Sequence, residues 1–582
     1  MRKVMGGQII AEMLAAEGVD TVFGIIDGTY MGIQASFEKY QIRLISPRHE
    51  TSAAHMAGAY SRMTGKLGVC MASNGPGVAN ILPGVAVENA EGHRVLLLTS
   101  SRRSGIAYPD RGGTYQCFDQ VGVISKMAKY SAVASDFSRI PEIFRHAMRA
   151  AYSGRPGLVH IDVPENVLNG TYEIAREDQR TPAQYRNVGR LQPDPDGLDR
   201  AAALLRDAKF PLIHAGTGVM HAEAYSELCT LAETLGAAVT TSWSATASMP
   251  CRHPLRIPTA ALDAAKLARN EADVVLVVGS RVGETDWWGK APYWARDQQV
   301  IQIDIDETVL GANKPAELCL MADAKLAMAG LIERLKAQGS SEAIISARRE
   351  TLSKIAETRD TLLEALNSVL VHRGNPMHPA HVPTTCREFF PADAICVVDG
   401  GNTAVWTNFY HSTKAPNTLL STFKFGMLGA GVPQALGAKA AHPDKQVYCI
   451  IGDGAMGFHL QEIETAVRHE LPLTVVVLCD KQWGMVKTTQ SFALGQVRKV
   501  IGVESKQPTF NADFSEIAFD QVAIAMGAHG ERVSEVEQLR PALERATASG
   551  KPAVIHVDVD PMLHMMAPGL MEFKAMHQEP EG

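Results

Sequence analysis

Short apolar runs recur along the whole chain, and each is followed by a stretch with helical periodicity. The clearest runs cover residues 21–26, 67–72, 94–100, 157–163, 274–280, 300–306, 394–400, 447–454, 473–480 and 553–559. Runs of this length and apolarity are typical of strands that are buried on both faces, as in parallel sheets covered by helices. The pattern therefore predicts an α/β protein with several doubly wound units.

The length of the chain requires more than one core. Its 582 residues exceed what a single hydrophobic core supports, and three domains of ordinary size are expected. Two polar stretches rich in Gly, Ser and Pro interrupt the pattern at 176–197 and 336–381. We therefore expect domains at about 1–175, 190–335 and 365–560, followed by a tail at 561–582. The first and third are alike in plan, since each has a Gly-rich turn from strand to helix.

Composition excludes several classes of function. The formal net charge of −7 leaves no basic footprint, so nucleic acid is not an expected partner. The nine cysteines are scattered without a CxxC pair, which argues against a disulfide framework or structural zinc. No apolar run reaches the length of a bilayer, and the first residues lack the apolar core of a signal peptide. A cytoplasmic protein without membrane contact is expected.

The run at 447–454 ends in Gly452-Asp453-Gly454, and a second acidic residue, Asp480, ends the next apolar run. At the carboxyl edge of a parallel sheet such a turn exposes its carboxylate where ligands bind, and glycine permits close backbone approach. Each motif alone could be an ordinary turn or a helix cap. Together they favour Mg²⁺, which prefers one or two carboxylates plus phosphate oxygens.

With this pair, the chain resembles thiamine diphosphate-dependent enzymes of the acetolactate synthase, benzaldehyde lyase and 2-hydroxyacyl-CoA lyase group. The family carries Gly-Asp-Gly and, about two dozen residues later, an Asn-Asn pair whose second Asn binds Mg²⁺. This chain has Cys479-Asp480 there, which adds a negative charge beside the metal. The resemblance implies that Asp453, Asp480 and the backbone carbonyl of Gln482 are the metal ligands.

The segment 46–69 resembles the part of the family that contains its catalytic glutamate, which here is Glu50. In the family this carboxyl group hydrogen-bonds the aminopyrimidine of the cofactor and promotes loss of the thiazolium proton. That role requires a carboxyl group in an apolar pocket, shifted towards its protonated form. The alternative is that Glu50 caps a helix beginning at Thr51-Ser52. The adjacent His49 is either a catalytic residue or a packed, hydrogen-bonded one.

Further segments resemble the family's cofactor-binding turns, at 73–80, 397–408, 423–441 and 482–486, and a loop over the thiazolium at 112–122. The resemblance places Gln116, with Tyr115 beside it, against the substrate. It makes Leu428 the wedge that bends the cofactor, although a leucine among glycines is otherwise more often simply part of the core. The implied cofactor contacts are Pro76, Asn80, Gly401, Asn402, Thr403, Gly426, Leu428, Gly452, Gly454, Ala455, Trp483, Gly484 and Met485.

The resemblance also implies an assembly. In this family residues of the Glu50 type and of the Gly-Asp-Gly type meet only across a subunit interface. A homodimer or homotetramer is therefore expected, with the cofactor and a small-molecule substrate between two chains.

The sequences of the middle domain and the tail give less specific indications of function. A Gly216-x-Gly218 turn, with Arg281, Asp304 and Asp306 at later strand ends, allows a nucleotide site. Relatives bind the ADP part of FAD there, or a CoA or ADP nucleotide, or nothing. FAD is not expected, because its glycine-rich segment is missing. The Met-rich tail either closes over the active site or is a loosely docked terminus.

The function implied is formation or cleavage of a C–C bond beside a carbonyl. An acetolactate synthase-like carboligase or decarboxylase of 2-oxo acids is the leading expectation. A 2-hydroxyacyl-CoA lyase or a benzaldehyde lyase-like carboligase is the first alternative. An FAD-bearing oxidase of the pyruvate oxidase type and a non-catalytic relative are further ones.

Overall fold

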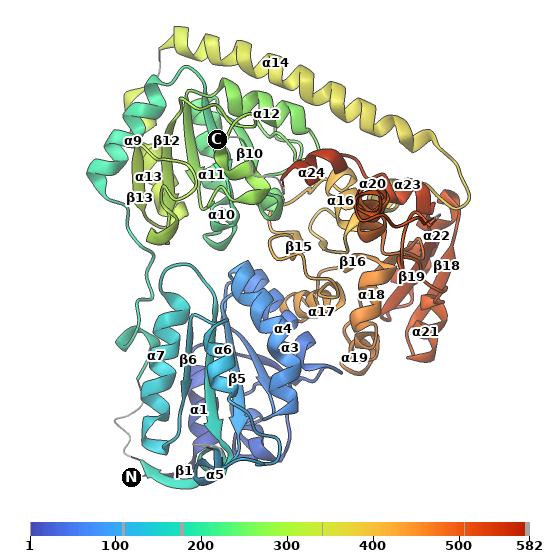
Figure 1. Cartoon of the computed structure of the whole chain (residues 1–582). Coiled ribbons are helices and arrows are strands. Elements are labelled where there is room, and N and C mark those ends of the chain that lie inside the picture. The colour runs from blue at the N-terminus through green and yellow to red at the C-terminus, as the bar shows by residue number, and fades with distance from the viewer. Residues whose placement is uncertain (1, 108–110, 175–179, 340, 506, 577–582) are drawn as a thin grey trace.

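Three parallel sheets follow one another along the chain in the computed structural model, which describes residues 2–107, 111–174, 180–339, 341–505 and 507–576. In Figure 1 the N-terminal unit lies at the bottom, the central unit at the upper left and the C-terminal unit at the right. Helices cover the faces of each sheet, as buried parallel strands require. The expected α/β architecture of three doubly wound units is confirmed.

The N-terminal sheet has six parallel strands in the order β3-β2-β4-β5-β7-β6. Its strands are β2 (Thr21–Ile25), β3 (Arg43–Ile45), β4 (Gly68–Ala72), β5 (Val95–Ser101), β6 (Tyr130–Val133) and β7 (Leu158–Pro164). Its helices are α1 (Gly6–Ala16), α2 (Met31–Phe37), α3 (Glu50–Thr64), α4 (Pro76–Glu91), α5 (Ser104–Ala107), α6 (Gln120–Ser125), α7 (Ile140–Tyr152) and α8 (Glu165–Asn169). Two short strands, β1 (Arg2–Met5) and β8 (Thr171–Ile174), pair antiparallel beside it.

The C-terminal sheet repeats this order as β15-β14-β16-β17-β19-β18. Its strands are β14 (Ile395–Asp399), β15 (Leu419–Ser421), β16 (Val447–Gly452), β17 (Thr474–Cys479), β18 (His529–Val533) and β19 (Ala553–Asp558). Its helices are α15 (His381–Phe389), α16 (Asn402–Tyr410), α17 (Gly431–Ala441), α18 (Asp453–His459), α19 (Glu462–Arg468), α20 (Gly484–Val500), α21 (Phe519–Ala525), α22 (Val536–Ala548), α23 (Pro561–Met565) and α24 (Leu570–Met576). The similar plan of the first and third units thus extends to their complete strand order.

The central sheet has five parallel strands in the order β10-β9-β11-β12-β13. They are β9 (Pro211–Ala215), β10 (Ala238–Thr241), β11 (Val274–Val278), β12 (Gln299–Asp304) and β13 (Leu318–Met321). The flanking helices are α9 (Pro195–Asp207), α10 (Thr217–His221), α11 (Tyr225–Leu235), α12 (Leu262–Glu271) and α13 (Ala324–Gln338). Among the described residues, no helix is both long and apolar enough to cross a membrane.

Helices α3 and α17 join the first and third units into one core. A Cβ atom on Gly437 would lie 2.2 Å from the carbonyl oxygen of Met56, so the two backbones are in contact at this point. Buried side chains of both units, including Ala53 and Ala57 from α3 and Leu436 from α17, belong to the same hydrophobic cluster. The helix that starts at Glu50 is therefore held firmly against the C-terminal unit.

One long helix, α14 (Glu342–Asn367), connects the central and C-terminal units along the top of the molecule (Figure 1). Its Arg348 is 1% exposed although the neighbouring Arg349 is exposed. The guanidinium donates hydrogen bonds to carbonyl oxygens at the ends of two helices, Leu205 and Arg206 of α9 and Leu235 of α11. A cation is favourable at helix C-termini, where the last carbonyls lack partners.

We expect Arg348→Ala to lower the free energy of unfolding by at least about 2 kcal/mol, because several buried carbonyl oxygens lose a charged donor. Urea unfolding followed by far-UV circular dichroism measures the change. Arg349→Ala is the matched control and should stay within about 0.5 kcal/mol of the unmodified protein. Equal effects of the two substitutions would show that these hydrogen bonds do not hold α14 in place.

Candidate active site at the carboxyl edge of the C-terminal sheet

Three segments meet at the carboxyl edge of the C-terminal sheet: 400–403, 452–455 and 480–485. They follow β14, β16 and β17, which are neighbours in register, with Asp399 opposite Ile451 and Gly452 opposite Leu478. The strand ends of a parallel sheet lie at one edge, so these segments must come together. Asp453 and Asp480 therefore follow adjacent strands, as the sequence predicted.

Glycines allow these segments to approach one another closely. A Cβ atom on Gly484 would lie 2.6 Å from Nδ2 of Asn402 and 3.3 Å from Oδ2 of Asp480. A Cβ atom on Gly454 would lie 2.8 Å from the ring of Trp483. The remaining predicted contacts lie in the same place. A Cβ atom on Gly401 would lie 3.2 Å from Met485, and one on Gly452 would lie 2.9 Å from Oγ1 of Thr403. Ala455 is buried at the start of α18.

Asp453 is a buried carboxylate that faces a second one. Its two oxygens accept hydrogen bonds from the backbone N–H groups of Gly454 and Lys481, each at 2.7 Å. Burial and the negative charge of Asp480 raise the pKa of Asp453 to about 7. A bound cation would remove this repulsion, which is the electrostatic demand of a metal site.

Asp480 is held through one of its oxygens. Oδ2 accepts hydrogen bonds from Nδ1 of His564 at 2.7 Å and from Nε2 of Gln482 at 3.0 Å. Among the described residues, no hydrogen bond reaches Oδ1. Next to this carboxylate, Asn402 is 3% exposed, and neither atom of its side-chain amide has a hydrogen-bond partner within the described part of the chain.

The residues present fit a divalent cation with a diphosphate. Two carboxylates face each other, and a buried amide beside them offers a donor and an acceptor that the described residues leave unused. Helix α18 begins at Asp453, so its first N–H groups point to the same edge.

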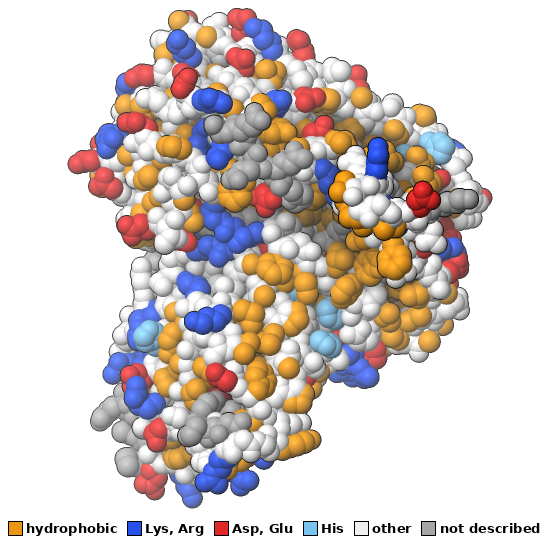
Figure 2. All heavy atoms as spheres, viewed as in Figure 1, with side chains coloured by type: hydrophobic (Ala, Val, Ile, Leu, Met, Phe, Trp, Pro, Cys, Tyr) orange, Lys and Arg blue, Asp and Glu red, His pale blue; other side chains and the backbone are white. Residues whose placement is uncertain are grey.

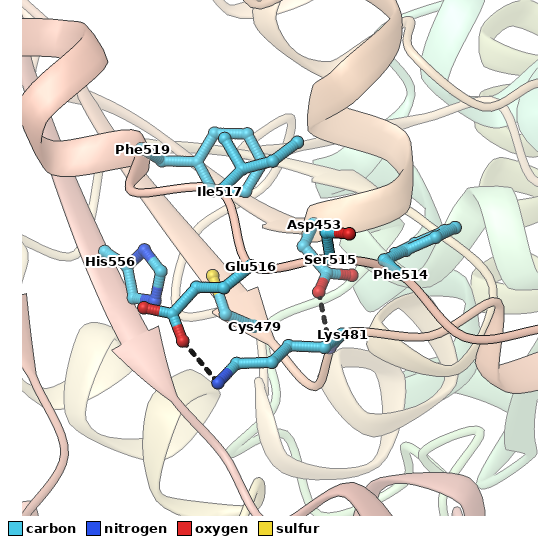
Figure 3. Close-up of a pocket in the computed structure, with 9 residues that line it drawn as sticks. All are labelled: Asp453, Cys479, Lys481, Phe514, Ser515, Glu516, Ile517, Phe519 and His556. Carbon is cyan, nitrogen blue, oxygen red and sulfur yellow. Dashed lines mark hydrogen bonds and ion pairs between the residues drawn. The ribbon is translucent and has the colours of Figure 1, made fainter.

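A small pocket opens on one side of Asp453, between the ends of β16 and β17 and the segment 514–519 (Figure 3). Its floor includes Cys479, and Lys481 closes it through an ion pair of 2.5 Å with Glu516. The side chain of Phe514 packs edge-on against Trp483, with ring centroids 4.6 Å apart. This segment therefore covers the Gly-Asp-Gly turn from one side.

The structure places Glu50 at the first position of α3, and His49 takes the capping role. Nδ1 of His49 accepts the backbone N–H of Thr51 at 3.2 Å, so the interpretation of Glu50 as the cap is wrong. Nδ2 of Asn80 instead donates to the Glu50 carboxylate at 3.1 Å, which places these two predicted site residues together. His49 also packs against His459 of α18, with ring centroids 5.6 Å apart.

The turn at 73–76 carries the loop with Gln116. The carbonyl oxygen of Gln116 accepts a hydrogen bond from Nδ2 of Asn74 at 3.0 Å, and a Cβ atom on Gly75 would lie 2.7 Å from it. Pro76 follows as the first residue of α4, and its side chain is exposed. Tyr115 is 75% exposed and does not point into the described protein. Gln116 therefore lies against the turn that precedes Pro76, and Tyr115 projects outwards.

Asp399 was not predicted as a site residue, yet it fixes the loop that carries Gly426 and Leu428. Its Oδ2 accepts hydrogen bonds from the backbone N–H groups of Gly429 at 2.9 Å and of Gly431 at 2.7 Å. Burial raises the pKa of Asp399 to about 6. Leu428 is partly buried against the shared core of the first and third units. The sequence shows an aspartate in the 397–408 segment. It does not show that this carboxylate binds the loop that carries Leu428.

The glycines of the central Gly216-x-Gly218 turn have a structural use. A Cβ atom on Gly216 would lie 2.1 Å from the carbonyl oxygen of Gly279, so the turn needs glycine for packing.

Arg281, at a strand end of the central unit, lies beside Arg155 of the N-terminal unit. Burial and the positive charge of Arg281 lower the pKa of Arg155. Figure 2 shows Lys and Arg side chains gathered where the central and N-terminal units adjoin.

Comparisons with known proteins agree with this geometry. The chain matches the family models of the thiamine pyrophosphate enzymes in all three parts: the N-terminal TPP binding domain over 4–123, the central domain over 198–331 and the C-terminal TPP binding domain over 399–557. It is 31% identical to a sulfoacetaldehyde acetyltransferase of Alcaligenes xylosoxydans xylosoxydans, with 96% of this chain and 93% of the relative aligned.

The chain is a thiamine pyrophosphate-dependent enzyme. Two further relatives of this enzyme are acetolactate synthase large subunits. One, from Mycobacterium tuberculosis, is 30% identical over 95% of this chain and 96% of its own length. A probable one from Methanococcus aeolicus is 28% identical over 97% of this chain and 94% of its own length. The family predicted from the residues is thereby confirmed.

A pH dependence follows from Asp399. Its pKa is raised in the folded state, so the stability that its neutral form contributes is present below about pH 4 and is lost as the pH rises through about 6. Relative to Asp399→Asn, the unmodified enzyme should lose about 2 kcal/mol of unfolding free energy between pH 4.5 and 7.5, because the rest of the total loss occurs below pH 4.5. Urea unfolding of both proteins across this range measures the difference. Parallel pH curves would contradict it.

Proposed function

We propose that this enzyme is a thiamine diphosphate- and Mg²⁺-dependent carboligase or decarboxylase of 2-oxo acids, similar in activity to acetolactate synthase. The observation that carries the proposal is the meeting of Asp453, Asp480 and Asn402 at one sheet edge, where the Asn402 amide has no hydrogen-bond partner among the described residues. The acetolactate synthases among its full-length relatives support the choice of substrate.

In this proposal, Asp453, Asp480 and the backbone carbonyl of Gln482 hold the cation. Gly401, Asn402, Thr403 and the first turn of α18 bind the diphosphate. When bound, thiamine diphosphate supplies a nucleophilic carbon and an electron sink for C–C bond chemistry beside a carbonyl. The protein orients it through Leu428 and the carbonyl of Gly426, whose loop Asp399 fixes.

Glu50 holds the proton that the pyrimidine ring needs. Its carboxylate lies between α3 and α4, with Nδ2 of Asn80 donating to one oxygen and Gly77 close to the other. In this proposal the carboxyl group would exchange a proton with a nitrogen of the pyrimidine ring, as a general acid–base group does. Gln116 lies over the turn at 73–76 and would face the substrate.

A second candidate is a sulfoacetaldehyde acetyltransferase activity, because an enzyme of that name is 31% identical to this chain over 96% of its residues. Arg155, Arg281 and Lys424 lie together between the units, but Glu91, Asp304 and Asp306 lie beside them, so the charges there are mixed.

Release of CO₂ from pyruvate tests the proposed donor. With added thiamine diphosphate and Mg²⁺ the purified enzyme should release CO₂, and Glu50→Gln should reduce the rate by about 10²–10⁴-fold, the range of a general acid–base contribution. Glu38→Gln, the same substitution at an exposed position, is the matched control. Asn80→Asp would not serve as a control, because Asn80 contacts Glu50.

The outcomes separate the two candidates. Absence of CO₂ release from a protein that binds thiamine diphosphate would contradict a 2-oxo acid donor. Consumption of sulfoacetaldehyde by the same preparation after addition of an acetyl acceptor, and loss of this consumption in Glu50→Gln, would then favour the second candidate.

We also propose that the enzyme is a homodimer or homotetramer with its active sites between chains. Apolar side chains are exposed along α20 and nearby, and Figure 2 shows hydrophobic side chains gathered where the N-terminal and C-terminal units adjoin. The exposed residues include Phe425, Phe458, Val486, Phe492, Val497 and Val500. A second copy of the chain would cover such a surface.

Mixing two inactive variants tests whether the site is shared. Random assembly of Glu50→Gln chains with Asp453→Asn chains makes half of the dimers mixed, and each mixed dimer has one intact site. Coexpression should therefore restore about a quarter of the normal activity per site, whereas each variant alone stays inactive. No recovery in mixed dimers, verified by two affinity tags, would show that Glu50 and Asp453 act within one chain.

A further inference from the structure

We propose that His564, in the C-terminal segment, is the positioning residue that adapts the metal site to aspartate at position 480. The inference rests on the proposed Mg²⁺–thiamine diphosphate site but is independent of the substrate. It assigns a function to part of the Met-rich tail, which the sequence left between a lid and a loosely docked terminus.

The imidazole of His564 is fixed on every side. It is 3% exposed, its Nδ1 lies 2.7 Å from Oδ2 of Asp480, and its Nε2 lies 3.2 Å from Oγ1 of Thr403. Its own backbone carbonyl accepts the indole N–H of Trp406 at 2.9 Å. Because a carboxylate only accepts, Nδ1 carries the hydrogen in this contact. The ring thus joins the predicted metal ligand to the predicted diphosphate loop.

A second donor reaches the same carboxylate oxygen, and its orientation is also fixed. Oε1 of Gln482 accepts from Nζ of Lys487 at 2.9 Å, and Nε2 donates to the carbonyl of Pro561 at 2.8 Å. The amide nitrogen of Gln482 must therefore face Asp480, where it lies 3.0 Å from Oδ2. Two N–H donors converge on one oxygen.

This arrangement explains why an aspartate suits this chain. The family has asparagine at this position, and an asparagine whose oxygen faced the metal would turn its NH₂ group towards the two donors. Donor would then face donor in a buried place, which costs free energy. A carboxylate instead presents an acceptor to both sides, with Oδ2 held by the protein and Oδ1 left for the cation. Partners of this kind orient ligands and commonly change metal affinity 10- to 100-fold.

The C-terminal segment that carries His564 is anchored at several points. Pro561 begins α23 at the Gln482 contact, and Nζ of Lys574 on α24 donates to Oγ1 of Thr489 on α20 at 2.6 Å. The ring of Phe573 packs 5.9 Å from that of Trp243 in the central unit. Docking of this segment and assembly of the metal site therefore occur together.

Mg²⁺ titration of the full chain with saturating thiamine diphosphate, followed by calorimetry, tests the proposal. Histidine is replaced in two ways: asparagine carries its amide nitrogen near the position of Nδ1, and glutamine carries it near that of Nε2. We expect His564→Gln to weaken Mg²⁺ binding by about 10- to 100-fold, and His564→Asn to stay within about threefold. A purely structural role would not distinguish the two.

Asp480→Asn provides the second arm. Alone it should weaken Mg²⁺ binding by about tenfold or more, and in its background His564→Gln should add less than about threefold. Met566→Gln, at an exposed position of the same segment, is the matched control and should leave binding unchanged.

Three results would overturn the proposal: unchanged Mg²⁺ affinity in His564→Gln, equal losses in the Gln and Asn variants, or full additivity with Asp480→Asn. If His564→Gln does not fold, unchanged Mg²⁺ affinity in Asp480→Asn alone overturns it. An unmodified enzyme that binds neither Mg²⁺ nor thiamine diphosphate would instead contradict the proposed cofactors.

Discussion

The contact between α3 and α17 is the constraint on which the rest of the molecule depends. Gly437 touches the backbone of Met56, and no other residue would allow the helices to approach so closely. Helix α3 begins at Glu50, and α17 begins directly after the Leu428 loop. One backbone contact thus fixes the relative position of two sheets and of the loops at their ends.

Within the C-terminal unit, electrostatics decides the chemistry. Two buried carboxylates at adjacent strand ends repel each other, and the fold keeps them there through backbone N–H groups, Gln482 and His564. Such a pair is unfavourable for the folded protein without a cation. Binding of a metal and cofactor would therefore also stabilise the fold, since part of the repulsion disappears.

The sequence predicted what depends on local pattern. Buried strands such as β11 and β17 have continuous apolar runs, and Gly-Asp-Gly marks its own turn. Short edge strands such as β3 and β18 have mixed burial and no clear pattern, so they were missed. Asp399 and His564 act on partners 30 and 84 residues away, and nothing in their own segments reveals those partners.

Helix α14 fixes an angle as well as a length. Arg348 anchors it to the central unit, and the carbonyl of Leu366 accepts the hydroxyl of Tyr410 in the C-terminal unit at 3.0 Å. These positions are five helical turns apart, so they share one face at a spacing of about 27 Å. One inserted residue would turn the two anchors about 100° out of phase. A whole inserted turn would restore the phase but lengthen the spacing by about 5.4 Å, so the two anchors together determine the number of residues between them.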